Sequence, residues 1–144
     1  MPKGWTELPF TEVFADVSAG QTKTLARDFL VEGDYPLIDQ GQSAIGGYTN
    51  DGAALSTVEL PVIIFGDHTR ALKFVDFPFG VGADGVKILR PKIDADARFL
   101  YRYLKSVRIE AAGYDRHFKY LKRISVPLPP IEEQRRIAAV LDQA

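Results

Sequence analysis

Apolar residues recur at the spacing of a helix in three parts of the chain. Near the N-terminus they fall at i, i+3, i+4 and i+7, which is typical of a helix with one buried face. These residues are Phe10, Val13, Phe14 and Val17. We therefore predict a short amphipathic helix that ends near Gly20.

A second helix is predicted over residues 97–112. Asp96 is placed to cap its start, and Gly113 is a natural residue just past its end. Its core face would consist of Phe99, Leu100, Tyr103, Leu104 and Val107. Its other faces would carry the basic residues Arg98, Arg102, Lys105 and Arg108.

A third helix is predicted to begin after Pro130, because proline suits a first helical turn and Glu132 and Glu133 would lie at the positive end. Five residues would share one side of it, namely Ile131, Gln134, Ile137, Ala138 and Leu141. We expect this side to be partly exposed. The sequence reaches Ala144 without a helix-ending signal, so we expect either a longer natural chain or a half-length form.

Continuous apolar runs rich in β-branched residues predict strands. We expect strands at 35–39, 61–65, 71–75 and 86–89, and an extended segment at 121–128. Glycine and polar residues predict irregular structure at 21–34, a loop at 40–52, a tight turn at 67–70 and a turn between strands at 79–85.

The composition fits one folded domain. The chain has 144 residues, of which 46% are hydrophobic and 26% charged, so it can bury a core. It has no cysteine, which excludes disulfides, thiolate metal sites and cysteine catalysis. No apolar run has the length of a signal peptide or a membrane helix. We expect a cytoplasmic protein without a membrane partner.

The formal net charge is −1, but the basic residues are concentrated in one segment. Residues 98–123 contain 8 Lys and Arg against 2 Asp and Glu, whereas residues 1–97 contain 8 against 14. A local basic stripe is what phosphate binding requires. A solvated helix face is the alternative interpretation.

Within that segment, residues 113–123 alternate basic side chains with aromatic rings. This arrangement offers a nucleic acid phosphate contacts together with ring faces and hydroxyls. The candidate DNA-contacting residues are Tyr114, Arg116, His117, Lys119, Tyr120 and Lys122. Alternatively the segment is structural; we expect Phe118 and Leu121 to pack inward while the neighbouring basic side chains point outward.

The turn at 67–70 is a second candidate, because it is polar and lies between two apolar strands. Arg70 can form two parallel hydrogen bonds to guanine, and His68 or Thr69 can read other base edges. Asp67 would orient Arg70 or cap the turn, and a plain surface hairpin is the alternative. The loop at 40–52 supplies weaker candidates, which are Gln40, Gln42, Ser43, Tyr48 and Asn50.

Enzymatic chemistry has little support in the sequence. The two histidines, His68 and His117, lack a serine elbow, and only Asp67 and Asp76 lie near His68 as weakly spaced metal ligands. The glycines of residues 80–85 match a dinucleotide pattern in letters but lead into a strand rather than a helix. We expect no catalytic residue, no metal and no cofactor.

The stretch VPLPPIEEQRRIAAVLDQ, residues 126–143, resembles the end of a target-recognition domain in type I restriction-modification specificity subunits. The matching residues are Pro127 to Pro130, Glu133, Gln134, Ile137 and Ala138. Gly4-Trp5 and Gly20 are similar to the start of such domains. VIIFGDHTRALKFVDFPF and GADGVKILR are similar to one subtype, so the resemblance spans nearly the whole chain.

The resemblance implies an α/β fold, a small, twisted, mostly antiparallel sheet with flanking helices. Residues 1–126 would form the target-recognition domain, and residues 127–144 a proline-rich junction and the start of a connecting helix. It further implies that the chain recognises half of a bipartite site in double-stranded DNA and has no catalytic activity of its own.

The resemblance also implies partners. Methyltransferase subunits would dock on the connecting helix, a restriction-translocation subunit would join the complex, and a half-subunit would pair with a second copy. The partner-binding residues would be Glu133, Gln134, Ile137 and Leu141.

Two other hypotheses remain. The chain could be a protein-interaction module that docks through its C-terminal helix without reading bases, or a small enzyme that uses His68 or His117. Binding to random duplex DNA that weakens steeply with salt would favour DNA recognition over both.

Overall fold

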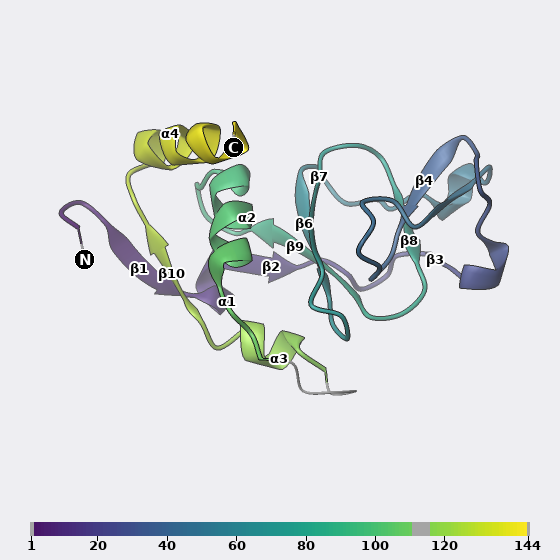
Figure 1. Ribbon diagram of the computed structural model, residues 1–144, viewed down its shortest axis with the longest axis horizontal. Coiled ribbons are helices and arrows are strands. Elements are labelled where there is room, and N and C mark those ends of the chain that lie inside the picture. Colours follow the sequence, from purple (N-terminus) through teal and green to yellow (C-terminus); the bar gives the residue numbers. More distant parts are fainter. Residues whose placement is uncertain (1, 111–115, 144) are drawn as a thin grey trace.

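The fold is described from a computed structural model, in residues 2–110 and 116–143. Three sheets follow one another along the long axis of the molecule, and helices α2 and α4 lie at one end of it (Figure 1). The predicted fold class, an α/β domain with mostly antiparallel pairing and flanking helices, is confirmed. The strands are divided among three sheets, however, rather than gathered in one.

The central sheet has the strand order β2-β9-β6-β7 and is antiparallel throughout. Its strands are β2 (Phe14–Asp16), β9 (Val86–Pro91), β6 (Val62–Gly66) and β7 (Leu72–Val75). β6 is apolar along its length because both its faces are buried: Ile63 and Phe65 join one core, and Val62 and Ile64 join another. The strands predicted at 61–65, 71–75 and 86–89 are confirmed.

The N-terminal segment links this sheet to a two-stranded one, in which β1 (Thr6–Pro9) pairs antiparallel with β10 (Ser125–Leu128). Between β1 and β2, α1 (Phe10–Val13) is a single turn. The predicted helix to near Gly20 is wrong beyond Val13, because Phe14 is extended and pairs with β9. Tertiary pairing overrides the helical spacing here.

The third sheet is rich in glycine and has the order β3-β8-β4-β5. Its strands are β3 (Lys23–Thr24), β8 (Gly80–Gly82), β4 (Tyr35–Ile38) and β5 (Gly47–Thr49). β8 runs parallel to β3 and β4, so residues 80–82 form a strand where a turn was predicted. A Cβ on Gly80 would lie 2.7 Å from the Leu37 side chain, so glycine allows this close approach.

Short segments complete the lobe around the third sheet. The 3₁₀ turn Ala26–Asp28 lies in the segment predicted to be irregular, the 3₁₀ turn Gly52–Ala54 begins at the last residue of the loop predicted at 40–52, and β5 interrupts that loop. The strand predicted at 35–39 is confirmed as β4.

The helix predicted at 97–112 is present but shorter. α2 spans Ala97–Ser106, and the Asp96 carboxylate caps it by accepting a hydrogen bond from Phe99 N at 2.8 Å, as predicted. Val107 already has an extended backbone, which brings the partly buried Ile109 against the first core. Gly113, the predicted residue past the end, lies outside the described residues.

The last two helices flank β10. α3 (Phe118–Leu121) ends at the first residue of the segment predicted to be extended, 121–128, and the strand β10 forms only its second half. α4 (Ile131–Asp142) begins directly after Pro130, as predicted, with Glu132 and Glu133 in its first turn. The boundary predicted between residues 126 and 127 falls inside β10 and stays a prediction.

Two hydrophobic cores lie on opposite faces of the central sheet. The first joins the helices to β6, β9 and β10, and the second joins β6, β7 and β9 to β4 and β8. No helix in the described part of the chain is long and apolar enough to cross a membrane.

Candidate nucleic-acid interface

The turn between β6 and β7 is closed by its own backbone. Gly66 N donates to Ala71 O at 2.9 Å, and Arg70 N donates to Gly66 O at 2.8 Å. Arg70 has a left-handed backbone with a φ of 65°, a conformation that costs a non-glycine residue roughly 1–2 kcal/mol. The predicted turn is confirmed, and its hydrogen bonds hold Arg70 in a conformation that it does not favour by itself.

The three candidate base readers of the turn are exposed but are not equivalent. Thr69 Oγ1 donates to the backbone oxygen of Gln40 at 2.7 Å, which ties the turn to the loop that follows β4. Arg70 Nη1 donates to Ile109 O at 2.6 Å, so its guanidinium lies toward the segment after α2. His68 is anchored through its backbone N, which donates to Gln40 Oε1 at 2.7 Å.

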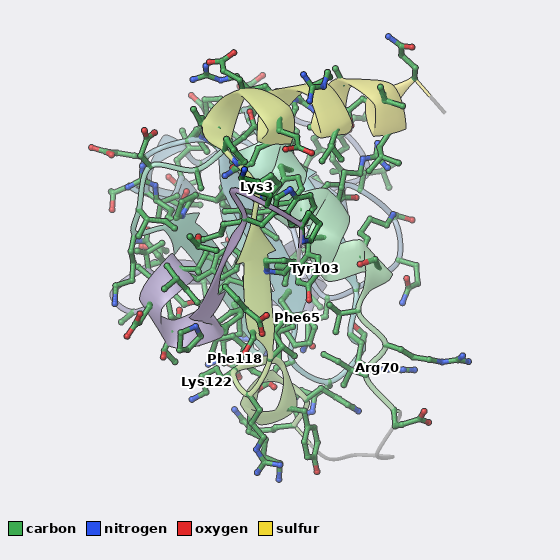
Figure 2. All side chains as sticks on the ribbon, turned by 90° about the vertical axis from the view of Figure 1, so that its left-hand side faces the viewer. Lys3, Phe65, Arg70, Tyr103, Phe118 and Lys122 are labelled. Carbon is green, nitrogen blue, oxygen red and sulfur yellow. The ribbon has the colours of Figure 1, made fainter. Side chains whose placement is uncertain are left out.

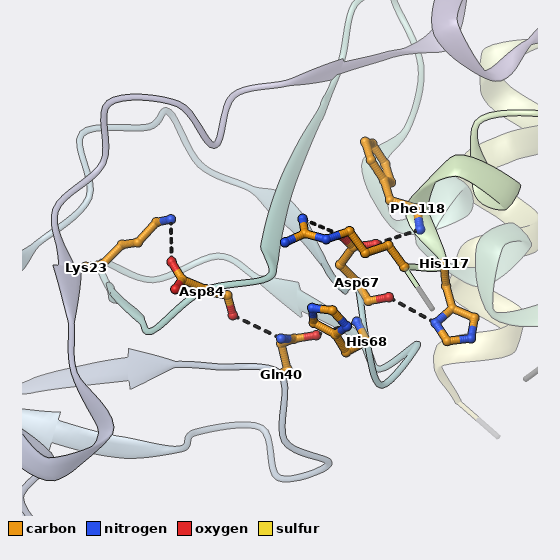
Figure 3. A network of polar contacts seen from close by, with 8 residues as sticks. Lys23, Gln40, Asp67, His68, Asp84, His117 and Phe118 are labelled. Carbon is orange, nitrogen blue, oxygen red and sulfur yellow. Dashed lines mark hydrogen bonds and ion pairs between the residues drawn. The ribbon is translucent and has the colours of Figure 1, made fainter. Parts of the chain in front are cut away.

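Asp67 is 2% exposed and connects the turn to the basic segment (Figure 3). Its carboxylate accepts a hydrogen bond from Phe118 N at 2.8 Å and pairs with Arg116 at 3.3 Å. Its backbone oxygen accepts one from His117 N at 2.7 Å. The prediction that Asp67 orients Arg70 or caps its own turn is therefore wrong, because this carboxylate binds the chain around Phe118 instead.

Basic side chains surround the buried ring of Phe118. Phe118 and Leu121 are buried, as predicted, and the Nζ atoms of Lys122 and Lys87 each lie 5.3 Å from the centre of the Phe118 ring. Lys87 comes from β9 and was missed by the sequence analysis. Its position between the buried Val86 and Ile88 in a predicted strand was the available signal, because alternate strand residues point to opposite faces.

The other candidates of the basic segment differ in exposure. Arg116 and Lys119 are exposed and Tyr120 is half-buried. His117 is only 1% exposed, with its Nδ1 3.0 Å from Asp67 O, so it belongs to the joint between the turn and α3 rather than to the surface. Tyr114 lies outside the described residues.

The candidates of loop 40–52 are divided between two places. Gln40 lies against the turn, and Gln42 borders a cavity of about 430 Å³ beside Arg70. Ser43 is exposed in the same loop. Tyr48 lies on β5 and lines a separate groove with Phe29 and Leu30. Asn50 Oδ1 accepts a hydrogen bond from Asp34 N at 2.9 Å, within the third-sheet lobe.

Two ion pairs lie near the turn, one partly buried and one exposed. Lys73 Nζ lies 2.8 Å from Asp39 O and 3.5 Å from its carboxylate, which anchors the start of the loop to β7. Burial lowers the pKa of Lys73, against the raising effect of Asp39. Lys23 binds the Asp84 carboxylate at 2.9 Å, and this hydrogen bond and charge lower the pKa of Asp84.

α4 lies on the side of the molecule opposite Lys122 and Arg70 (Figure 2). The side of α4 that we predicted to be partly exposed is largely covered: Gln134 is 3% exposed and hydrogen-bonded to Asp96 N and Pro129 O, and Ile137 packs against the first core. Glu133 is half-buried. Exposed apolar surface remains at the far end, where Leu141 is 41% exposed and Val140 62%.

The described residues offer little for metal chemistry. No three of their His, Asp or Glu side chains are grouped to hold a metal ion. Asp76, the more distant of the two carboxylates considered near His68 in sequence, pairs with Arg98 at 3.3 Å.

A family model for the type I restriction modification DNA specificity domain matches residues 2–144. The chain belongs to this family. The specificity-domain family includes a curated relative, the EcoR124I/EcoR124II specificity subunit of Escherichia coli, which is 28% identical over 149 aligned positions. The match covers 94% of this chain and 37% of that relative, so the chain spans little more than a third of its length.

Solved structures show the same fold for this specificity domain. A chain from a study of complex assembly and conformational transition of the type I R-M system has a TM-score of 0.72 at 22% identity, over 99% of this chain and 38% of that one. The type I S subunit from M. genitalium has a TM-score of 0.71 at 19% identity, over 96% of this chain and 38% of that one. The HsdS subunit from Thermoanaerobacter tengcongensis has a TM-score of 0.59 at 20% identity, over 99% of this chain and 38% of that one.

Proposed function

We propose that this chain recognises the sequence of double-stranded DNA, as a target-recognition domain that directs a type I restriction-modification complex to one half of a bipartite site. The observation that carries the proposal is the joint at Asp67. It holds a tight polar turn against a basic segment, so that side chains suited to bases and side chains suited to phosphates lie next to each other.

In this function the two parts of the surface have different tasks. Arg70 and His68 project from the turn and meet base edges in the major groove, where an arginine can bind guanine O6 and N7 together. Arg116, Lys119 and Lys122 contact phosphates, and Lys87 extends this surface from β9. Gln42 and Ser43 meet the DNA beside Arg70, Tyr120 meets it beside the basic side chains, and Tyr114 is a further contact.

The complex supplies what this chain lacks. Methyltransferase subunits dock along α4 and carry out methyl transfer, a restriction-translocation subunit joins them, and a second recognition domain or copy reads the other half-site. This chain itself has no catalytic role. Its formal net charge of −1 fits this division, since the methyltransferase subunits add phosphate affinity while the chain selects bases.

Docking without base reading is a second candidate function, which the exposed Val140 and Leu141 favour. The two functions make different predictions for DNA. The complete complex should bind a duplex that contains the site it methylates at least about 1,000 times more tightly than a random duplex, within the range for specific DNA binders. Fluorescence anisotropy measures both affinities. Equal affinity for the two duplexes would leave only the docking function.

A further inference from the structure

Gln40 lies where three separate segments of the chain meet (Figure 3). Its Oε1 accepts a hydrogen bond from His68 N at 2.7 Å, and its Nε2 donates one to Asp84 O at 3.0 Å. Its backbone oxygen accepts a third from Thr69 Oγ1 at 2.7 Å. One residue therefore ties the loop after β4 to the turn at 67–70 and to the turn at 83–85.

Two glycines leave room for this side chain. A Cβ on Gly85 would collide with Gln40 Nε2, and a Cβ on Gly66 would lie 3.3 Å from Gln40 Cβ and would collide with Thr69 Oγ1. Gly85 also has a φ of 82°, which favours glycine. The close fit holds the amide of Gln40 in one place.

We propose that Gln40 is a positioning residue for sequence discrimination, which fixes the turn at 67–70 in the register that meets base edges. The proposal rests on the function proposed above and changes the role predicted for Gln40. Both ends of its amide are already bonded to the protein's own backbone, so its role is to hold His68 and Arg70 rather than to contact a base itself.

The physical reason is preorganisation. A turn that is ordered before binding loses less conformational entropy when it meets the correct bases. Phosphate contacts depend little on this order, because lysine and arginine side chains at the surface adjust their own positions. Removing Gln40 should therefore weaken binding to the cognate site and leave binding to random DNA unchanged.

The test compares Gln40→Ala with Gln21→Ala in the complete complex. Gln21 is a matched control, because its amide also ties two loops: Oε1 accepts from Thr57 N at 2.9 Å and Nε2 donates to Thr57 Oγ1 at 3.3 Å. Gln40→Ala should lower the ratio of cognate to random affinity about tenfold, as expected for two lost hydrogen bonds. Gln21→Ala should leave that ratio unchanged.

A second variant separates positioning from direct contact. In an Arg70→Ala background the turn has already lost a base contact. A residue that only positions the turn then has a smaller effect on discrimination, whereas an independent base contact keeps its full effect. Gln40→Ala should then lower the ratio about twofold or less. Faster amide hydrogen exchange at His68 in the free Gln40→Ala protein should accompany the loss.

An unchanged ratio in Gln40→Ala, an equal loss in Gln21→Ala, or a full tenfold loss in the Arg70→Ala background would each overturn the proposal. If Gln40→Ala does not fold, Gln40→Glu keeps the acceptor for His68 N and replaces the donor to Asp84 O, and the same outcomes apply to it. A wild-type complex that does not discriminate between duplexes would overturn the proposed function itself, which is a different result.

Discussion

The side of the molecule with Arg70 and Lys122 and the side with α4 lie opposite each other (Figure 2) and both rest on the first core, but they join segments of different length. On the α4 side two continuous helices, α2 and α4, pack together with Ala138 and Leu104 buried, and the ion pair between Arg102 and Asp142 links them. On the other side, hydrogen bonds and ion pairs join short segments that are far apart in sequence, such as Asp67 and Phe118. The shape of this second side therefore depends more on individual polar contacts.

The largest effect should come from removing the Asp67 carboxylate, which joins the turn at 67–70 to the segment around Phe118. Asp67→Ala removes the acceptor for the buried Phe118 N–H and the partner that Arg116 has in Asp67. It should lower the free energy of unfolding by about 2–4 kcal/mol and weaken binding to every duplex. Urea unfolding measures the first effect. Asp67→Asn keeps the acceptor and should cost less than half as much; equal costs would contradict this role of the joint.

Removing the basic side chains should have the next largest effect. Replacing Arg116, Lys119 and Lys122 together by Ala should weaken binding to cognate and random duplexes alike, by about 100-fold near physiological salt. The slope of log affinity against log salt should flatten by about one unit for each lost phosphate contact.

A matched control has the same change in charge on the α4 side of the molecule, and both triple variants are compared in the isolated chain, where docking on α4 plays no part. Replacing Lys3, Arg135 and Arg136 by Ala should leave the salt slope for this chain's DNA contacts unchanged. An equal flattening in both triple variants would mean that the basic segment acts only through net charge.

A smaller and more selective effect is expected at Arg70. Arg70→Ala should cost about 1–3 kcal/mol on the cognate site and little on random DNA, because it removes a base contact. Arg70→Gly suits the left-handed backbone, so it should lose the same discrimination without loss of thermal stability. A uniform loss on both duplexes would instead make Arg70 a phosphate contact.

The smallest effect is expected at the far end of α4. Leu141→Asp changes an exposed apolar residue and should weaken assembly about tenfold while the fold stays intact. Ile137→Asp should instead destabilise the domain, because Ile137 packs against the first core. Light scattering and circular dichroism together separate the two. Unfolding of both variants would place Leu141 in the core as well.

A contrast between local and long-range interactions explains which elements the sequence predicts correctly. The helix starts at Asp96 and Pro130 follow from local capping chemistry, and β6 follows from its continuous apolar run, so these were found. α1 ends early because β2 pairs with β9, and residues 80–82 form a strand because β8 pairs with β3 and β4. Such pairings join distant segments and leave no local signal.

The candidate site shows this limit most clearly. The turn at 67–70 and the basic segment were both predicted, but their connection through Asp67 was not, since the two lie about fifty residues apart. Lys87 and Gln40 gain their proposed roles from neighbours supplied by other strands and turns. Residue type and local pattern predicted the candidate segments, and the fold adds which of their side chains contact one another.

The central claim, that this chain selects the DNA sequence, is tested most directly by mapping methylated sites in cells that express the complete system. The account predicts one bipartite motif for the wild type. With Arg70→Ala, the same motif should be methylated with relaxed preference at one base position in one half and with the other half unchanged. An identical motif in both strains would contradict base reading by this turn, and relaxation spread over both halves would contradict its assignment to one half-site.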